Sequence, residues 1–102
     1  MEFPTSIEGD KGIIVLEGDL DNEQTGELLK QAFETVFERG KRTVVLDMGK
    51  VQIINSYGIG KILSCYKQLR ENNGSLLVRN PQGFVKDTLE LLMLDQIIHF
   101  EA

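Results

Sequence analysis

The sequence is poor in the residues that build metal centres and disulfides. It contains one cysteine, Cys65, one histidine, His99, and no tryptophan. A lone cysteine excludes an intrachain disulfide and any paired-cysteine zinc or redox motif, and one histidine with one cysteine cannot supply the ligands of a zinc site. We therefore expect no metal site and no cofactor. Cys65 shares a helical phase with Ile62 and Leu69, which predicts a packed thiol.

Positive charge is scarce as well. The chain has 11 Lys and Arg residues against 16 Asp and Glu residues, which gives a formal net charge of −5 at pH 7. The basic residues are scattered along the chain rather than clustered. Because binding to nucleic acid depends on neutralising phosphates, this composition argues against a nucleic-acid-binding protein.

Long apolar runs are missing. Runs such as residues 13–16 are far shorter than the roughly 20 residues that span a bilayer, and residues 1–4 lack the basic and apolar character of a leader. We expect a cytoplasmic protein without membrane insertion. The chain of 102 residues, with 41% hydrophobic and 26% charged residues, fits one globular domain over residues 1–102.

What the chain does contain is an alternation of strand-like and helix-like apolar patterns, which indicates an α/β domain. Asp21 or Asn22 is predicted to cap a first helix, at 21–38, and Gly40 to end it. In a third helix, which should begin at Asn80 and Pro81, the apolar face should consist of Phe84, Val85, Leu89 and Leu92. The expected elements are a strand at 13–17, a helix at 21–38, a strand at 44–47, a helix at 56–71, a strand at 76–79, a helix beginning at Asn80 and Pro81, and a strand at 97–100.

The most informative segment is residues 44–60. Residues 44–46 read as a buried strand, Ile53 and Ile54 return the chain to the core, and Asn55-Ser56 stands where a helix N-cap belongs. The first backbone N–H groups of a helix lack partners and carry partial positive charge, so a phosphate on Ser56 would be tolerated there. By residue type alone, Ser56 could simply be the N-cap.

The order of these features resembles the STAS domain, and in particular its stand-alone bacterial members, the anti-sigma factor antagonists. Asn55-Ser56-Tyr57-Gly58-Ile59-Gly60 is similar to the hallmark Asp-Ser-Ser/Thr-Gly-Leu-Gly of that family. Residues 18–21 resemble its Gly-x-Leu-Asp, and residues 74–78 resemble its next strand. The resemblance covers nearly the whole chain. It implies a single STAS domain in which a mixed β-sheet carries helices packed mainly on one face.

That resemblance implies a regulatory binding protein. Such a protein, when dephosphorylated, docks on an anti-sigma factor that is a serine kinase and so frees the sigma factor; phosphorylation, here at Ser56, releases it. The implied partner-binding residues are Asp21, Asn55, Ser56, Tyr57 and Gly58. A phosphate would add about −1.5 to −2 charges near Asp19, Asp21 and Asp47. The alternative is a constitutive STAS adaptor in a signalling scaffold or phospholipid-transport complex. Either protein would be a monomer or weak dimer.

Two residues depart from the family hallmark. Asn55 stands where the family has Asp, and Tyr57 stands where it has a small residue. Asn keeps the capping geometry of Asp, so Asn55→Asp should leave the fold unchanged, although phosphorylation without the carboxylate could be slow or absent. Tyr57 would then be a partner-specific anchor. Gly58 and Gly60 should let the helix start pack closely on the sheet, so that Gly60→Ala lowers the melting temperature.

Motifs of other functions fail on residue identity. For a dinucleotide fingerprint the third glycine would be Leu63, and for a P-loop the hydroxyl position would be Ile62. For an EF-hand begun at Asp19, the glycine would be Gln24. A Ser56–His99 dyad has no identifiable third group to orient it, so we expect no enzyme. Asp47, Met48 and Lys50 are expected in a solvated turn.

Overall fold

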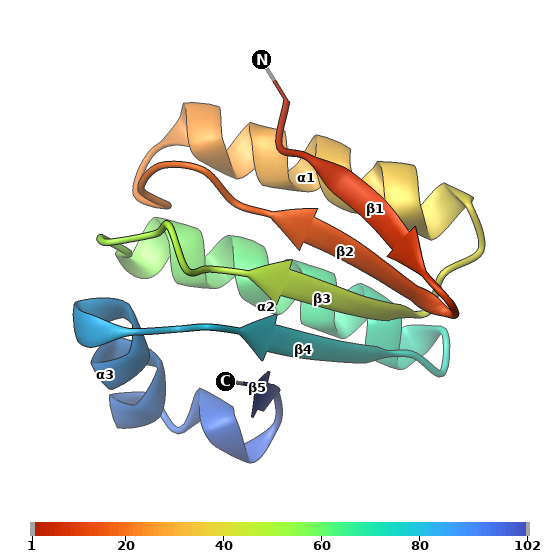
Figure 1. The fold of residues 1–102 in the computed structure, drawn as a ribbon. Helices are drawn as coiled ribbons and strands as arrows, with labels where there is room; N and C mark the ends of the chain where they lie inside the picture. Colours follow the sequence, from red (N-terminus) through yellow and green to blue (C-terminus); the bar gives the residue numbers. More distant parts are fainter. Residues whose placement is uncertain (1, 102) are drawn as a thin grey trace.

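The computed structural model describes residues 2–101, which form a five-stranded sheet with three α-helices (Figure 1). The strand order in the sheet is β1-β2-β3-β4-β5, the same as the order along the chain. The elements are β1 (Thr5–Glu8), β2 (Lys11–Val15), α1 (Glu23–Glu38), β3 (Thr43–Asp47), α2 (Ser56–Glu71), β4 (Ser75–Arg79), α3 (Gly83–Leu91), the 3-10 helix η1 (Leu94–Gln96) and β5 (His99–Glu101).

The sheet is mixed. Strands β1 and β2 pair antiparallel, whereas β2, β3, β4 and β5 pair parallel to one another. Parallel neighbours need a crossover, and α1 and α2 supply two of them. Both helices cover the same face of the sheet in Figure 1, and α3 lies beyond β4 near one edge. The expected α/β architecture, a mixed sheet with helices mainly on one face, is confirmed.

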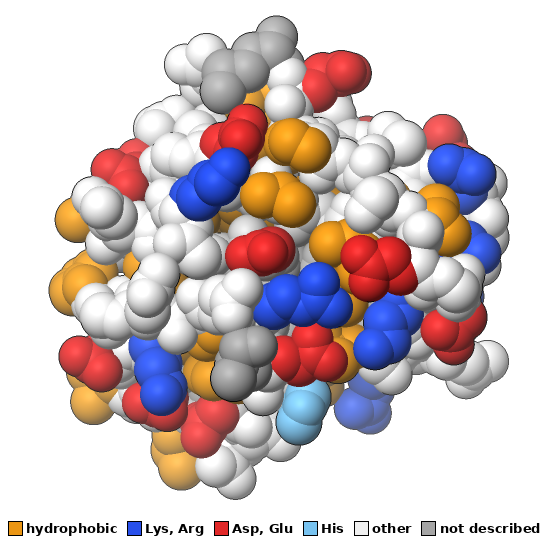
Figure 2. Space-filling view, in the orientation of Figure 1, with side chains coloured by type: hydrophobic (Ala, Val, Ile, Leu, Met, Phe, Trp, Pro, Cys, Tyr) orange, Lys and Arg blue, Asp and Glu red, His pale blue; other side chains and the backbone are white. Residues whose placement is uncertain are grey.

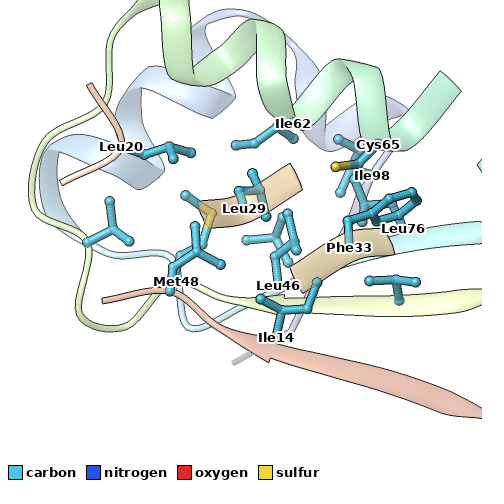
Figure 3. Close-up of a cluster of buried hydrophobic side chains, with 14 of the residues drawn as sticks. Ile14, Leu20, Leu29, Phe33, Leu46, Met48, Ile62, Cys65, Leu76 and Ile98 are labelled. Carbon is cyan, nitrogen blue, oxygen red and sulfur yellow. The ribbon is translucent and has the colours of Figure 1, made fainter. Parts of the chain in front are cut away.

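The core lies between this face and the helices. Alternate residues of the parallel strands point toward α1 and α2, and these residues are almost entirely buried (Figure 3). Cys65 of α2 is 6% exposed within this cluster, and burial raises the pKa of its thiol to about 12. The prediction of a packed thiol is therefore confirmed. The main side chains of the cluster are Ile14, Leu16, Leu29, Phe33, Val44, Leu46, Ile62, Leu69, Leu76 and Val78.

Strand β1 was not predicted, and β2 begins before the expected range of 13–17. Only one residue of β1, Ile7, is even partly buried, because β1 is an edge strand with a polar sequence. The signal for it lies in the turn. Glu8 pairs with Lys11, and Gly9 between them has a φ of +65°, so Gly9-Asp10 is the kind of two-residue hairpin turn that joins antiparallel strands.

The start of the third helix was predicted wrongly. Asn80 and Pro81 do not begin it; α3 starts at Gly83 after the N-cap Gln82, and Asn80 has a positive φ of 58°. Val85 and Leu89 are buried as expected, but Phe84 and Leu92 are 57% and 49% exposed. Phe84 is in the first turn of α3 and Leu92 is its C-cap, so both lie at the ends of the helix rather than on the face that Val85 and Leu89 turn to the core. The closing strand also starts later than expected, at His99, because η1 intervenes.

Candidate functional site

The two loops that precede α1 and α2 lie side by side at the carboxyl end of the parallel strands, on the left in Figure 1. Leu20 and Ile54 form an isolated parallel bridge between them, and the Leu20 N–H donates to the Ile53 carbonyl at 3.0 Å. Leu20 and Ile54 are 1% and 3% exposed, whereas Ile53 is 44% exposed. The bridge therefore anchors both loops in the core and leaves Ile53 on the surface.

Asp19, on the loop before α1, holds the loop before α2 in place. Its Oδ1 accepts hydrogen bonds from the backbone N–H groups of Gln52, at 3.3 Å, and Ile53, at 3.1 Å. A carboxylate that accepts backbone N–H groups forms charge-assisted hydrogen bonds, which are stronger than neutral ones. From the sequence, Asp19 is expected to have a capping or turn role and to add negative charge. Its contact with Gln52 and Ile53 was not predicted, because it joins residues more than 30 positions apart.

Asn55 is the N-cap of α2. Its Oδ1 accepts from the Gly58 N–H at 3.2 Å, and its Nδ2 donates to the Asp21 carbonyl at 3.0 Å. The one amide therefore caps α2 and ties it to the loop before α1. Asn22 caps α1 in the same way, accepting from the Thr25 N–H at 3.0 Å, so the second of the two predicted caps is the correct one.

Ser56 is the first residue of α2, not its N-cap, and it is exposed. Because Asn55 does the capping, the Ser56 hydroxyl is not needed for it. The first N–H groups of a helix have no backbone partner within the helix; that of Gly58 is capped by the Asn55 side chain, and the Ile59 N–H makes the first helical bond, to the Asn55 carbonyl. A phosphate on Ser56 would thus stand beside the positive end of the helix macrodipole.

Gly58 is required by a close approach to Leu20. A Cβ at Gly58 would collide with the Leu20 carbonyl oxygen, so only glycine fits. The expected close packing at Gly58 is correct, although the neighbour is the loop before α1 rather than a strand. The expectation of close packing is wrong for Gly60, because a Cβ there would meet no atom within 4 Å.

Tyr57 reaches across to α1. A Cβ at Gly26 would lie 2.5 Å from Tyr57 Cε1, so the ring packs on the bare backbone of Gly26. The Lys61 Nζ lies 5.4 Å from the ring centroid, and Tyr57 remains 38% exposed. Sequence reasoning missed Gly26, although a glycine inside a helical pattern often marks such a packing site.

The residues between β3 and α2 differ from the expected solvated turn. Met48 is fully buried, and Asp47 accepts from the Gly49 N–H at 3.0 Å. Lys50 is exposed and pairs with Glu17 at 3.3 Å.

Within residues 2–101, no three His, Cys, Asp or Glu side chains come together as metal ligands, and no helix is long and apolar enough to cross a membrane. We call Asp21, Ile53, Asn55, Ser56 and Tyr57 the Ser56 surface.

The sequence profile of the STAS domain matches residues 3–102. The chain belongs to the STAS domain family. Its order of elements is thus that of a STAS domain, and the resemblance to this family drawn from residues 18–21, 55–60 and 74–78 is confirmed.

The known relatives include anti-sigma factor antagonists. The anti-sigma F factor antagonist of Paenibacillus polymyxa is 28% identical over 96% of this chain and 86% of that protein. A candidate anti-sigma factor antagonist of Bordetella bronchiseptica, BtrV, is 31% identical over 69% of this chain and 60% of its own length. Phosphorylated SpoIIAA, a cell fate determinant of Bacillus, superimposes with a TM-score of 0.74 over 98% of this chain and 91% of its own, at 19% identity. Anti-sigma factor antagonists are regulatory proteins and not enzymes.

Proposed function

We propose that this STAS domain, which we take to extend over residues 1–102, is an anti-sigma factor antagonist. It binds a serine-kinase anti-sigma factor through the Ser56 surface, and phosphorylation at Ser56 ends that binding. Such a protein acts where transcription takes place, in the bacterial cytoplasm. The observation that carries the proposal is the exposed Ser56 hydroxyl at the first position of α2, spared from capping by Asn55.

The surroundings of Ser56 suit a protein partner. Ile53 and Tyr57 are large apolar residues that remain 44% and 38% exposed on either side of Ser56 in the sequence. Tyrosine and other large side chains supply much of the binding energy at protein interfaces. Asp21 is partly exposed on the adjoining loop and contributes a negative charge. The partner surface should therefore be apolar at its centre, with a hydrogen-bond acceptor for the Ser56 hydroxyl.

A phosphate can act as a switch here without refolding the domain. It adds about −1.5 to −2 charges at neutral pH, and the carboxylates of Asp19 and Asp21 already stand on the neighbouring loop. The helix dipole tolerates the added charge within the protein. A partner fitted to a neutral hydroxyl meets a bulky dianion instead, so the complex is destabilised on the partner's side.

The test is phosphorylation by the cognate kinase followed by intact mass measurement. Wild type should gain one phosphate, whereas Ser56→Ala should gain none and still bind the kinase. Ser64→Ala is the matched control, since Ser64 is an exposed serine on the same helix, and it should be labelled like wild type. Ser56→Asp should bind the kinase at least about tenfold more weakly, a loss of about 1.4 kcal/mol. Equal labelling of wild type and Ser56→Ala contradicts the proposal.

One observation favours the second candidate, a constitutive adaptor. Both polar atoms of the Asn55 amide are engaged, with Gly58 and Asp21, and an amide cannot take a proton from Ser56. If a carboxylate at this position is needed for phosphoryl transfer, wild type will resist the kinase while binding it normally. If wild type binds the kinase without being phosphorylated and Asn55→Asp is phosphorylated, the adaptor role is assigned.

A further inference from the structure

Four large apolar side chains are exposed in the segment that ends α3 and continues through η1 to Ile97. Leu91 is 83% exposed, Met93 66%, Leu92 49% and Ile97 47%. We call Leu91, Leu92, Met93 and Ile97 the α3 patch. Single exposed apolar residues are common, but a cluster of them on a monomer more often marks an interaction site. The patch adjoins β5, away from the loops that carry Ser56 (Figure 1).

The segment that carries the α3 patch is firmly attached. Val85 and Leu89 anchor α3, and Leu94 and Ile98 anchor the following turn, all four being buried. The Leu92 N–H donates to the Thr88 carbonyl at 3.1 Å, and the Met93 N–H donates to the Glu90 carbonyl at 2.9 Å. Exposure of the patch is therefore a property of the folded chain and does not result from a frayed helix end.

Met93 is a residue that stability alone would not select. Its φ of 62° lies in the left-handed region, where glycine and asparagine are favoured and a long side chain is not. Its side chain is 66% exposed, so burial does not offset that strain. An unfavourable backbone conformation combined with an exposed apolar side chain is the pattern expected of a contact surface.

Charge indicates what the α3 patch can bind. The exposed charged residues of α3 and η1 are Asp87, Glu90 and Asp95 against a single cation, Lys86. In Figure 2, apolar surface and acidic side chains lie next to each other at the lower left, over the position of α3 in Figure 1. Two copies of this chain meeting through the patch would bring their carboxylates together, which disfavours a homodimer, and an anionic membrane would be repelled as well.

We propose that the α3 patch is a docking surface for a second protein, through an amphipathic helix whose apolar stripe is flanked by Lys or Arg. The apolar stripe covers Leu91 and Met93, and the flanking cations face Asp87, Glu90 and Asp95. Docking of this kind is independent of Ser56 and its phosphorylation, so it would let the domain hold a second protein while the Ser56 surface engages the first.

The test uses the full chain and a labelled helical peptide of leucine and lysine with one apolar stripe. Its control is a peptide of the same composition in shuffled order, without a stripe. We expect the striped peptide to bind, with amide NMR shifts centred on residues 87–97, and the shuffled peptide to bind at least about tenfold more weakly. Raising the salt concentration should weaken binding, because the charges are exposed.

Variants decide whether the α3 patch is responsible. Leu91→Gln combined with Met93→Asn removes two apolar side chains and suits the local backbone, so the domain should stay folded and the peptide should bind at least about tenfold more weakly. Asp87→Asn with Glu90→Gln should reduce both the affinity and its salt dependence. Ile53→Gln, a similar change on the Ser56 surface, should leave peptide binding unchanged. Unaltered binding to the Leu91→Gln, Met93→Asn variant refutes the proposal.

Two other occupants would also overturn it. In sedimentation, wild type should be a monomer over the accessible concentration range. A dimer that dissociates in the Leu91→Gln, Met93→Asn variant would assign the patch to a second copy of this chain. Binding of wild type, but not the variant, to phosphatidylcholine vesicles would assign it to a lipid surface. A monomer that ignores vesicles and binds the striped peptide through residues 87–97 supports the docking surface.

Discussion

The Ser56 surface and the α3 patch both expose apolar side chains, but they are held in place differently. At the Ser56 surface, two loops are joined by the backbone bridge between Leu20 and Ile54 and by hydrogen bonds from the side chains of Asp19 and Asn55 to backbone groups of the opposite loop. The α3 patch rests on buried side chains and includes a residue in an unfavourable conformation, Met93. The first fixes the start of α2, and with it Ser56, against the loop before α1, whereas the second exposes apolar area at some cost to stability.

Gly58→Ala should break the first arrangement and have the largest effect. The added Cβ collides with the Leu20 carbonyl, a backbone atom that cannot rotate away, so α2 must move from the loop before α1. We expect a loss of about 3 kcal/mol in the free energy of unfolding, at the upper end of typical overpacking costs. Urea unfolding followed by circular dichroism measures it. A loss well below 1 kcal/mol would mean that the two loops are not rigidly joined.

Asn55→Asp should destabilise the domain, contrary to the expectation from capping alone. One carboxylate oxygen can still accept from the Gly58 N–H, but the other replaces the donor to the Asp21 carbonyl and repels it. We expect a loss of about 1 kcal/mol, the net value of one hydrogen bond, since water can reach the Asp21 carbonyl at this exposed site. Thermal unfolding at pH 7 provides the measurement, with Asn55→Ser as the control, because serine keeps a capping oxygen and adds no charge. Equal stability of Asn55→Asp and wild type would show that the Asp21 contact contributes nothing.

Met93→Asn, at the α3 patch, should stabilise the domain, in contrast to the two changes at the Ser56 surface. Asparagine tolerates a φ of 62° better than methionine, and little apolar burial is lost because the side chain is 66% exposed. We expect a gain of about 1 kcal/mol. Leu91→Asn, which substitutes the same residue type in the last turn of α3, should give no gain. A Met93→Asn variant less stable than wild type would mean that Met93 has a structural role and would remove the strain argument for the patch.

Gly60→Ala gives the smallest change and the sharpest comparison with Gly58. The two glycines are two residues apart in α2, yet a Cβ at Gly60 meets open space. Alanine is the better helix former, so the variant should be more stable by about 0.5 kcal/mol. Opposite signs for Gly58→Ala and Gly60→Ala in the same urea experiment would show that the motif contains one glycine needed for packing and one that is not.

Local sequence was sufficient for the elements whose signals lie within a few residues. Helix α2 begins at Ser56 and ends at Glu71 as predicted, because its apolar stripe and its stop at Asn72-Asn73-Gly74 are both local. Helix α3 was less predictable, since Asn80-Pro81 looks like a helix start but Asn80 adopts a left-handed conformation. Strand β1 was missed because its stability comes from pairing with β2 rather than from its own side chains.

The same distinction between local signals and long-range contacts applies to the candidate site. The sequence by itself determined that a helix begins at Asn55-Ser56, because capping depends on residues three positions apart. The structure then showed that Asn55 is the cap and that Ser56 is exposed. Only the tertiary structure decided that Asp19 and Asp21 hold that cap against another loop, that Gly58 must be glycine and Gly60 need not be, and that Tyr57 lies on Gly26. Each of these depends on atoms brought within a few ångströms by the sheet, from residues about 30 positions apart, and no local pattern encodes such an approach.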